Sequence, residues 1–497
     1  MAEINAERPR VDRKARLQIL EQRILKQDAL DRRCNWNEVV LGFESDKTAM
    51  LEAERCIQCP AAPCIKACPV HNDIPGALWE LEQGNFIEAA NIFRLTSTMP
   101  EVCGRICPQE RLCEGLCVVG NEKRVPPVRP VAIGRLEAFV SDYQRRTEGL
   151  PMPVMPPWTG RRVAIIGAGP AGLTVAELVA REGHKAVVYD AWPKPGGILL
   201  YGIPNFKMGK EIAEEKVQLL EAMGVRFVPN SMFGRGIVID DLFAEGYDAI
   251  YLGHGAGIGA LTGIPGEDLR NIYQATDFLV RGNLTPDELP VEKLEPLSVG
   301  NRIVIVGGGD TSMDCVRTAV RLANESGRSE TVVTCLYRRT ENEMPGREEE
   351  RRHAKEEGVE FQFLTAPVEY VGDEEGQVTG VKCVRMMLGE PDESGRSGPV
   401  PIPGSEHVVE ADTVVLAVGY WGDRMLAEAA GLNHKRGLLV VDPETGETSH
   451  PGVFAGGDNV RGADLVVTAI AEAKRAGAGI LRHLARATTE SPVGSRP

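Results

Sequence analysis

The residues best suited to chemistry are cysteines, and eight of the chain's 12 lie between Cys56 and Cys117. They form two groups of four with two to five residues between neighbours: Cys56, Cys59, Cys64 and Cys68, then Cys103, Cys107, Cys113 and Cys117. Pro69 closes the first group, and Pro108 follows Cys107. Such spacings let several thiolates converge on one inorganic centre, and a proline directly after a cysteine is typical of ferredoxin-like cluster loops.

Two [4Fe–4S] clusters need eight cysteine ligands, and eight are present. The alternatives are two structural zinc sites or a block of buried free thiols. Zinc favours paired Cys-x2-Cys knuckles, and only one of the six spacings has that length. Buried thiols have no reason to gather in one stretch, so the pattern favours iron–sulfur clusters.

The partition of ligands between the clusters is predicted to be crossed. In two-cluster ferredoxins the fourth cysteine of a run often serves the other cluster. The predicted sets are Cys56, Cys59, Cys64 and Cys117 for one cluster, and Cys68, Cys103, Cys107 and Cys113 for the other. Residues 74–95, between the groups, carry apolar residues at helical spacing and predict a small helical domain.

A glycine-rich turn begins at Gly167, between an apolar strand at 163–166 and an apolar helix at 173–180. A second strand, 186–189, ends in Asp190. This order is the dinucleotide fingerprint: the glycines let the backbone approach a pyrophosphate, and the acid binds a ribose diol. The alternative is a structural turn in a non-binding Rossmann fold. The predicted contacts are Gly167, Gly169, Pro170, Ala171, Gly172 and Asp190.

The same pattern recurs about 140 residues later. A strand at 302–306 leads into Gly307, a helix covers 313–322, and a strand at 331–337 ends in two arginines. Arginine at that place suits a 2′-phosphate and predicts NADP(H) rather than NAD(H), the alternative being a solvated loop without a ligand. The predicted contacts are Gly307, Gly309, Asp310, Thr311, Ser312, Arg338 and Arg339.

A third signal lies near the end of the chain, where a strand leads into Gly457 and Asp458. An Ala-rich helix then begins with Val466, Val467 and Thr468 and runs to about residue 484. The Asp458 carboxylate fits the ribityl hydroxyls of FAD, and a helix N-terminus stabilises the negative charge of a reduced flavin. FAD is therefore predicted in the first site and a nicotinamide in the second.

The length of 497 residues predicts about three domains at roughly 100–200 residues each. The predicted fold class is α/β: an N-terminal helical two-cluster iron–sulfur domain precedes two Rossmann-like dinucleotide-binding domains, the NADP domain being inserted in the FAD domain. The predicted boundaries are 1–150 for the cluster domain, 160–290 and 409–497 for the two parts of the FAD domain, and 296–408 for the NADP(H) domain. Residues 149–160 hold four prolines and predict a linker.

Composition and charge exclude several classes of function. With 56 basic and 71 acidic residues the formal charge is −15, which disfavours nucleic acid and anionic lipid as partners. An apolar run long enough to span a membrane is absent, and so is a secretory h-region near the start, so we expect a soluble cytoplasmic protein with reduced thiols. Cys315, Cys335 and Cys383 are isolated in sequence, which argues against a disulfide reductase.

Two further segments have open interpretations. Residues 341–360 are densely charged. The alternatives are a docking face and a solvated helix, and such a charged run favours the solvated helix. Residues 13–30 place Leu17, Leu20, Ile24 and Ala29 near one helical face, which predicts a helix that clasps its own chain or docks onto another subunit.

Taken in order, these motifs resemble the glutamate synthase small (β) subunit family. They are the cysteine quartets, GAGPAG, the GGILLYGIP run at 196–204, GGGDTSMDC, YRR and AGGD. The wider group includes the large subunit of NAD-dependent ferredoxin:NADP oxidoreductase and sulfide dehydrogenase. The resemblance implies that FAD, NADP(H) and two [4Fe–4S] clusters pass electrons to a larger catalytic or ferredoxin/NAD-linked subunit in a hetero-oligomer. It adds Gly197 and Leu199 to the FAD contacts.

The sequence departs from the typical small subunit at three places. Cys103 resembles the ferredoxin:NADP oxidoreductase branch, with Glu101 as a substitute ligand; Lys207 replaces an arginine; and His254 replaces a small residue. The alternative functions are therefore the large subunit of an electron-bifurcating NAD-dependent ferredoxin:NADP oxidoreductase, an electron-transfer flavoprotein subunit of another complex, or a binding subunit without turnover.

Overall fold

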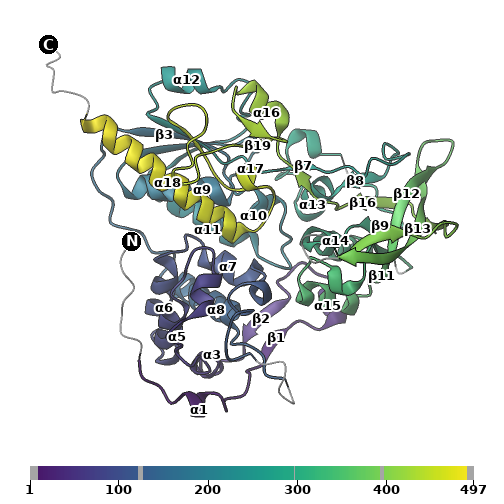
Figure 1. Ribbon diagram of the computed structural model, residues 1–497, viewed down its shortest axis with the longest axis horizontal. Coiled ribbons are helices and arrows are strands. Elements are labelled where there is room, and N and C mark those ends of the chain that lie inside the picture. The colour runs from purple at the N-terminus through teal and green to yellow at the C-terminus, as the bar shows by residue number, and fades with distance from the viewer. Residues whose placement is uncertain (1–8, 121–126, 296, 329, 392–396, 490–497) are drawn as a thin grey trace.

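The computed structural model describes residues 9–120, 127–295, 297–328, 330–391 and 397–489. Residue 296, the predicted start of the NADP(H) domain, lies outside these ranges. Figure 1 shows a helical N-terminal unit, a first parallel sheet beside the long C-terminal helix, and a second sheet to one side. None of the helices within the described ranges is long and apolar enough to cross a membrane.

The N-terminal unit packs short helices around the cysteines. Ser45 caps the first of them by accepting a hydrogen bond from the Thr48 N–H. The predicted helical stretch 74–95 forms two helices that are separated at Gly84, whose φ of +82° favours glycine. The helices are α3 (Asp46–Glu54), α4 (Pro63–Ala67), α5 (Ile74–Glu82), α6 (Phe86–Arg94), α7 (Pro100–Ile106) and α8 (Ile133–Thr147).

The first parallel sheet carries the first glycine turn. Its central strand is buried along almost its whole length, as expected for a parallel strand covered on both faces. The strand order is β20 (Val453–Ala455), β6 (Ala249–Leu252), β3 (Arg162–Ile166), β4 (Lys185–Tyr189) and β5 (Arg226–Val228). The covering helices include α9 (Pro170–Arg181), α11 (Lys210–Ala222) and α18 (Val466–Thr489), and α18 packs along α9.

The second parallel sheet carries the second glycine turn. Its order is β11 (Glu360–Phe363), β10 (Val332–Tyr337), β9 (Arg302–Val306), β16 (Thr413–Leu416) and β8 (Ile272–Gln274). Helices α13 (Ala275–Asn283), α14 (Asp310–Glu325) and α15 (Glu348–Glu356) accompany it. An antiparallel sheet packs its apolar residues against this one and is built from β12 (Thr365–Gly372), β13 (Val378–Pro391), β14 (Ser397–Pro401) and β15 (His407–Glu410).

The second sheet takes strands from both sides of the predicted 296–408 segment. β8 lies within 160–290 and β16 within 409–497, yet both pair in this sheet. Two short strands, β7 (Ile258–Gly259) and β17 (Tyr420–Trp421), pair where the chain passes between the sheets. The inserted unit therefore extends from about residue 260 to about residue 419. The predicted segment, 296–408, begins just before the strand of the glycine fingerprint and leaves out β8, which is only three residues long and half-buried.

The N-terminal segment differs from the predicted amphipathic helix. It forms α1 (Arg13–Arg16), β1 (Ile24–Lys26) and α2 (Ala29–Arg32), and β1 pairs with β2 (Val40–Phe43). A strand forms in place of the predicted helix because the backbone groups of Ile24–Lys26 pair with those of β2. The segment does clasp its own chain: Arg16 binds Glu82 at 2.6 Å. In Figure 1, β1 reaches across to α15.

The remaining elements are short and connect these layers. They are α10 (Ile198–Tyr201), α12 (Ile239–Ala244), α16 (Arg424–Ala429), α17 (Asp458–Arg461), β18 (His434–Lys435), β19 (Leu438–Leu439) and the 3-10 turns η1 (Gln109–Arg111), η2 (Val291–Lys293) and η3 (Glu341–Glu343).

Candidate functional site

The first glycine turn brings backbone unusually close together. Gly167 has a φ of +99°, and a Cβ built on it would lie 2.5 Å from the Gly253 carbonyl oxygen. A Cβ on Gly172 would lie 1.8 Å from the Gly167 carbonyl oxygen. Gly169 caps α9, so the helix begins with its N–H groups at the turn. This arrangement leaves room for a ligand phosphate at a helix N-terminus.

Asp190, at the end of β4, holds that turn in place. Its carboxylate accepts hydrogen bonds from the backbone N–H of Ala168 at 2.6 Å and of Trp192 at 2.9 Å. Burial raises the pKa of Asp190, and these two donors oppose the rise. Each carboxylate oxygen has a second lone pair, so Asp190 retains the capacity to accept a ribose hydroxyl.

Two more predicted residues complete the first site. Gly197 has a φ of +53°, and a Cβ there would lie 2.6 Å from the Gly169 Cα, so the second glycine loop packs directly on the turn. Asp458 begins α17, and its Oδ1 is buried without a hydrogen-bond partner among the described residues. Burial raises the pKa of Asp458 to about 6, and a hydrogen bond from the Asp464 backbone N–H opposes the rise.

The second turn repeats the first on the other sheet. Gly307 has a φ of +142°, and its Cβ would lie 2.2 Å from the Ala417 carbonyl oxygen. The two arginines after β10 differ: Arg338 is exposed, whereas Arg339 is buried and donates a hydrogen bond to the Ser397 carbonyl oxygen at 2.9 Å. Arg338 is therefore the better placed of the two to meet a 2′-phosphate.

Both turns open onto one cleft of ≈ 1810 Å³. The predicted residues that line it are Gly167, Gly169, Pro170, Ala171, Asp190, Gly197, Asp458, Gly307, Gly309, Asp310, Thr311, Arg338 and Arg339. The remaining predicted contact residues do not line the cleft: Gly172, Leu199, Gly457, Val467, Thr468 and Ser312. Leu199 is fully buried in the core of the first unit, whereas Ile198 and Tyr201, three positions apart on the same short helix, line the cleft.

The first crossed set of cysteines gathers around Cys64. The pKa of the Cys64 thiol rises to about 12, first through burial and then through three neighbouring thiols, which are Cys56, Cys117 and Cys59. Burial likewise raises the pKa of Cys56 to about 12, with Cys117 and Cys59 contributing. Cys59 and Cys117 are the two cysteines of this set that are not fully buried.

The second crossed set gathers next to the first sheet. A side-chain hydrogen bond with Cys103, then burial, raises the pKa of Cys107 well above its usual range, and Cys113 contributes. Burial raises the pKa of Cys113, and Cys68 is among its neighbours. Burial lowers the pKa of Lys474 on α18, and the nearby Cys68 thiol is one of the groups that oppose this fall. Lys474 donates a hydrogen bond to the Thr96 carbonyl oxygen at 2.5 Å. These thiol–thiol influences fall within the two crossed sets.

In the described residues, no three His, Cys, Asp or Glu side chains are arranged to hold a metal ion. The thiolates of a [4Fe–4S] cluster each bind a different iron and do not converge on one point. Glu101, the substitute ligand, is fully buried and pairs with Arg94 at 3.0 Å.

The helical unit reaches into the cleft beside the second cysteine set. Ile106 and Pro108, on either side of Cys107, line the cleft, and so do Arg111 and Leu112. Arg111 lies 3.6 Å from Asp310 at the start of α14. One cavity thus touches both glycine turns and the chain around Cys107.

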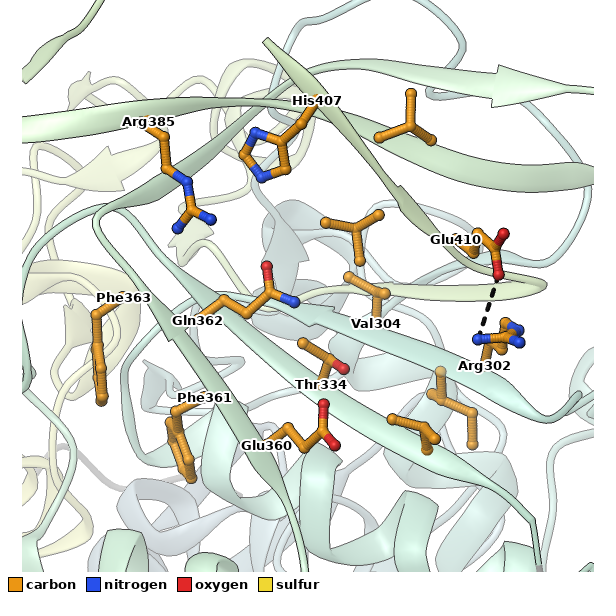
Figure 2. Close-up of a pocket in the computed structure, with 14 residues that line it drawn as sticks. Arg302, Val304, Thr334, Glu360, Phe361, Gln362, Phe363, Arg385, His407 and Glu410 are labelled. Atoms are coloured by element: carbon orange, nitrogen blue, oxygen red, sulfur yellow. Dashed lines mark ion pairs between the residues drawn. The ribbon is translucent and has the colours of Figure 1, made fainter. Parts of the chain in front are cut away.

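A smaller cavity of ≈ 500 Å³ lies between the second sheet and the antiparallel sheet. Figure 2 shows Arg385 and His407 on one side and the Arg302–Glu410 ion pair, 3.2 Å long, on the other. Its lining includes none of the residues predicted to contact a cofactor.

Three residues that line the large cleft were not predicted to bind a cofactor: Lys207, His254 and Tyr420. The sequence marks Lys207 and His254 as departures from the resembling family, and it gives no signal for Tyr420. Lys207 forms a buried ion pair with Asp314 on α14 at 2.7 Å, so the loop after α10 is tied to the second unit. The only available signal was the contrast with the resembling family.

Two family models match the chain. Residues 161–473 match the model described as pyridine nucleotide-disulphide oxidoreductase, and residues 32–149 match dihydropyrimidine dehydrogenase domain II, 4Fe-4S cluster. The match over 161–473 concerns the fold, because Cys315, Cys335 and Cys383 are free and buried. With the twin turns, these matches define the class: a pyridine-nucleotide-dependent oxidoreductase with an iron–sulfur domain.

The chain is 43% identical over 446 residues to the glutamate synthase [NADPH] small chain of Halomonas elongata, covering 88% of this chain and 91% of that one. The small chain of Escherichia coli K12 is 42% identical, with 88% and 92% covered. The chain belongs to the glutamate synthase small-chain family, which confirms the resemblance, and is an NADPH-dependent flavin and iron–sulfur oxidoreductase.

A solved structure shows the same fold. FprA of Mycobacterium tuberculosis in complex with NADPH superposes with a TM-score of 0.57 at 21% identity, covering 69% of this chain and 88% of that chain. The α/β architecture with an iron–sulfur domain ahead of it confirms the predicted fold class.

Proposed function

We propose that this chain is the NADPH-oxidising electron-transfer subunit of a glutamate synthase-type enzyme. The observation that carries the proposal is the single cleft lined by both glycine turns and by the residues around Cys107. A bound FAD would supply an acceptor for the hydride of NADPH, and bound [4Fe–4S] clusters would supply one-electron transfer. The protein's contribution is to hold these groups next to one another.

The residues of the first turn fit FAD. The unpartnered Oδ1 of Asp458 needs a donor, and a ribityl hydroxyl supplies one. The close backbone contacts at Gly167 and Gly197 leave no space for side chains where the dinucleotide would lie. Asp190 would hold the ribose at the other end of the cofactor.

The two crossed cysteine sets are proposed to hold two [4Fe–4S] clusters. Their raised thiol pKa values mean that cluster binding must displace protons, because thiolates are the ligands. Backbone N–H groups of Gln58, Ile65 and Asn72 already donate to sulfurs of the sets and would stabilise the bound thiolates.

We place the exit for electrons at the less buried edge of the first set, around Cys59 and Cys117. Leu116 and Val118 beside it are about half exposed, at 54% and 51%. A larger catalytic subunit, docked over this edge, would receive the electrons and form the hetero-oligomer that the name small chain implies for the relatives. Cys103 favours a second candidate, the large subunit of an NAD-dependent ferredoxin:NADP oxidoreductase.

The proposal is tested by anaerobic optical spectra of the purified chain together with iron and flavin assays. About eight irons and one FAD per chain are expected, with NADPH bleaching both chromophores far better than NADH. Zinc in place of iron, or a flavin that neither nucleotide reduces, would refute the function.

Replacing Arg338 with glutamine is expected to raise the KM for NADPH about tenfold to a hundredfold, because a charge-assisted phosphate contact is worth about 1.5–3 kcal/mol. The KM for NADH should stay unchanged, since NADH has no 2′-phosphate. Arg352→Gln removes the same charge from α15 outside the cleft and serves as the control. Equal losses with both nucleotides would contradict the assignment of Arg338.

A further inference from the structure

His254 is a partly exposed residue whose two ring nitrogens are nevertheless buried and take no part in the contacts already described. It follows β6, with Gly253 between, and it lines the large cleft. Both ring nitrogens are inaccessible to solvent, and neither has a hydrogen-bond partner among the described residues. Buried polar groups are normally paired, so an imidazole with two orphaned nitrogens indicates a missing partner.

The order of strands fixes where that partner must lie. β6 stands between β3 and β20 in the first sheet. On one side, a Cβ built on Gly167 would lie 3.0 Å from the His254 Cα. On the other side, the Asn459 side-chain amide donates to the Leu252 carbonyl oxygen at 2.8 Å. A dinucleotide that runs from Asp190 past the Gly167 turn to Asp458 therefore crosses the end of β6.

The imidazole is neutral at physiological pH. Burial lowers its pKa to about 4, and the opposing influence of Asp423 does not offset this. A neutral imidazole has one N–H donor and one acceptor nitrogen. The donor suits a phosphate or ribose oxygen, and the acceptor suits a hydroxyl, so both needs are met by one stretch of sugar–phosphate chain.

We propose that His254 is a binding residue for the flavin dinucleotide, donating a ring N–H hydrogen bond to an oxygen of its sugar–phosphate chain between the ribose and the ribityl group. The inference rests on the proposed function, because it takes FAD to occupy the first turn. It extends that function by assigning a contact to a residue at which this sequence departs from the resembling family.

The first test measures FAD affinity in the full chain. His254→Ala is expected to weaken FAD binding about tenfold to a hundredfold, measured as the flavin released on dilution. His254→Gln keeps a donor and should recover most of the affinity. Iron content and the dissociation constant of NADPH should match the unmodified chain. His184→Ala, which changes a half-buried histidine of the same unit away from the cleft, is the matched control.

The second test separates ligand binding from packing. A ligand that binds only the folded chain raises its unfolding temperature. His254→Ala should therefore lower the unfolding temperature of the FAD-loaded chain and leave that of the FAD-free chain unchanged or higher, since an orphaned polar group has been removed. Equal lowering in both forms would make His254 a packing residue and overturn the proposal.

Other outcomes are equally decisive. FAD affinity within twofold of the unmodified chain, or a loss confined to NADPH, would overturn the contact while leaving the proposed function intact. Failure of the unmodified chain to bind FAD at all would instead refute the proposed function itself.

Discussion

Replacing Glu357 with alanine is expected to lower the free energy of unfolding by about 3–5 kcal/mol, because buried guanidinium groups would lose their counter-charge. The Glu357 side chain is fully buried where the N-terminal segment meets the second unit. It binds Arg32 at 2.9 Å, Arg317 at 2.8 Å and Arg321 at 2.8 Å, three side chains that are themselves almost entirely buried.

The adjacent Glu356 is the matched control. It also binds Arg32, at 2.6 Å, but its side chain is 42% exposed. Glu356→Ala should cost no more than about 1 kcal/mol, as for other solvent-exposed ion pairs. Denaturant unfolding of both variants measures the difference, and equal destabilisation would show that burial of the Glu357 cluster is not what matters.

The same carboxylate makes stability depend on pH. Burial alone would raise the pKa of Glu357, but Arg317 and Arg321 outweigh it and lower the pKa from 4.5 to about 2. A lowered pKa contributes stability above the unfolded value, and this contribution is lost as the pH falls from about 4.5 to about 2. The Glu357→Ala variant should therefore show a flatter loss of stability across that window.

Replacing Cys113 with serine is expected to remove about half of the iron and to slow electron delivery to any acceptor beyond the flavin by about a hundredfold or more. Cys113 belongs to the set beside the cleft, where Arg111 and Leu112 directly precede it. Reduction of FAD by NADPH should change by no more than about threefold, because Asp190, Asp458 and the glycine turns are untouched. Iron assays and stopped-flow spectra of the FAD and cluster bands measure both steps.

Serine variants of the other cysteines test the crossed partition of ligands between the two clusters. Cys117→Ser should lose the same spectroscopic signal as Cys59→Ser, whereas Cys68→Ser should match Cys113→Ser. Cys34→Ser, which changes an exposed cysteine outside both sets, should retain full iron. Identical spectra for Cys117→Ser and Cys113→Ser would show that the second group of four works as a contiguous set instead.

The two glycine turns could be predicted from sequence because each lies in a continuous run whose hydrophobic period, glycines and terminal residue agree. Strands β3, β4, β9 and β10 begin and end within one residue of their predicted bounds. Such local consistency needs no knowledge of distant contacts. The cysteine groups were equally visible, since their spacing is itself the signal.

Features that depend on long-range pairing escaped prediction. Residues 341–360 were expected to form a solvated helix, yet His353 and Glu350 on α15 are buried against Arg317 and the N-terminal segment. The solvated-helix prediction is wrong because its charges find partners hundreds of residues away, as Glu349 does in Lys26 at 2.5 Å. A charged stretch of sequence shows which residues carry charge. It does not show whether distant residues supply the opposite charges that allow those side chains to be buried.

The interruption of the first sheet by the second unit sets an order for synthesis of the chain. Edge strand β20 and helix α18 come after the inserted unit in the chain and are translated after it. The ends of that unit already meet, since the Ala260 N–H donates to the Gly419 carbonyl oxygen at 2.9 Å. The inserted unit can therefore close on itself while β6 still lacks β20, its neighbour at the edge of the first sheet. Under the proposed role of Asp458 as a flavin contact, flavin binding would have to wait until this late part of the chain has been synthesised.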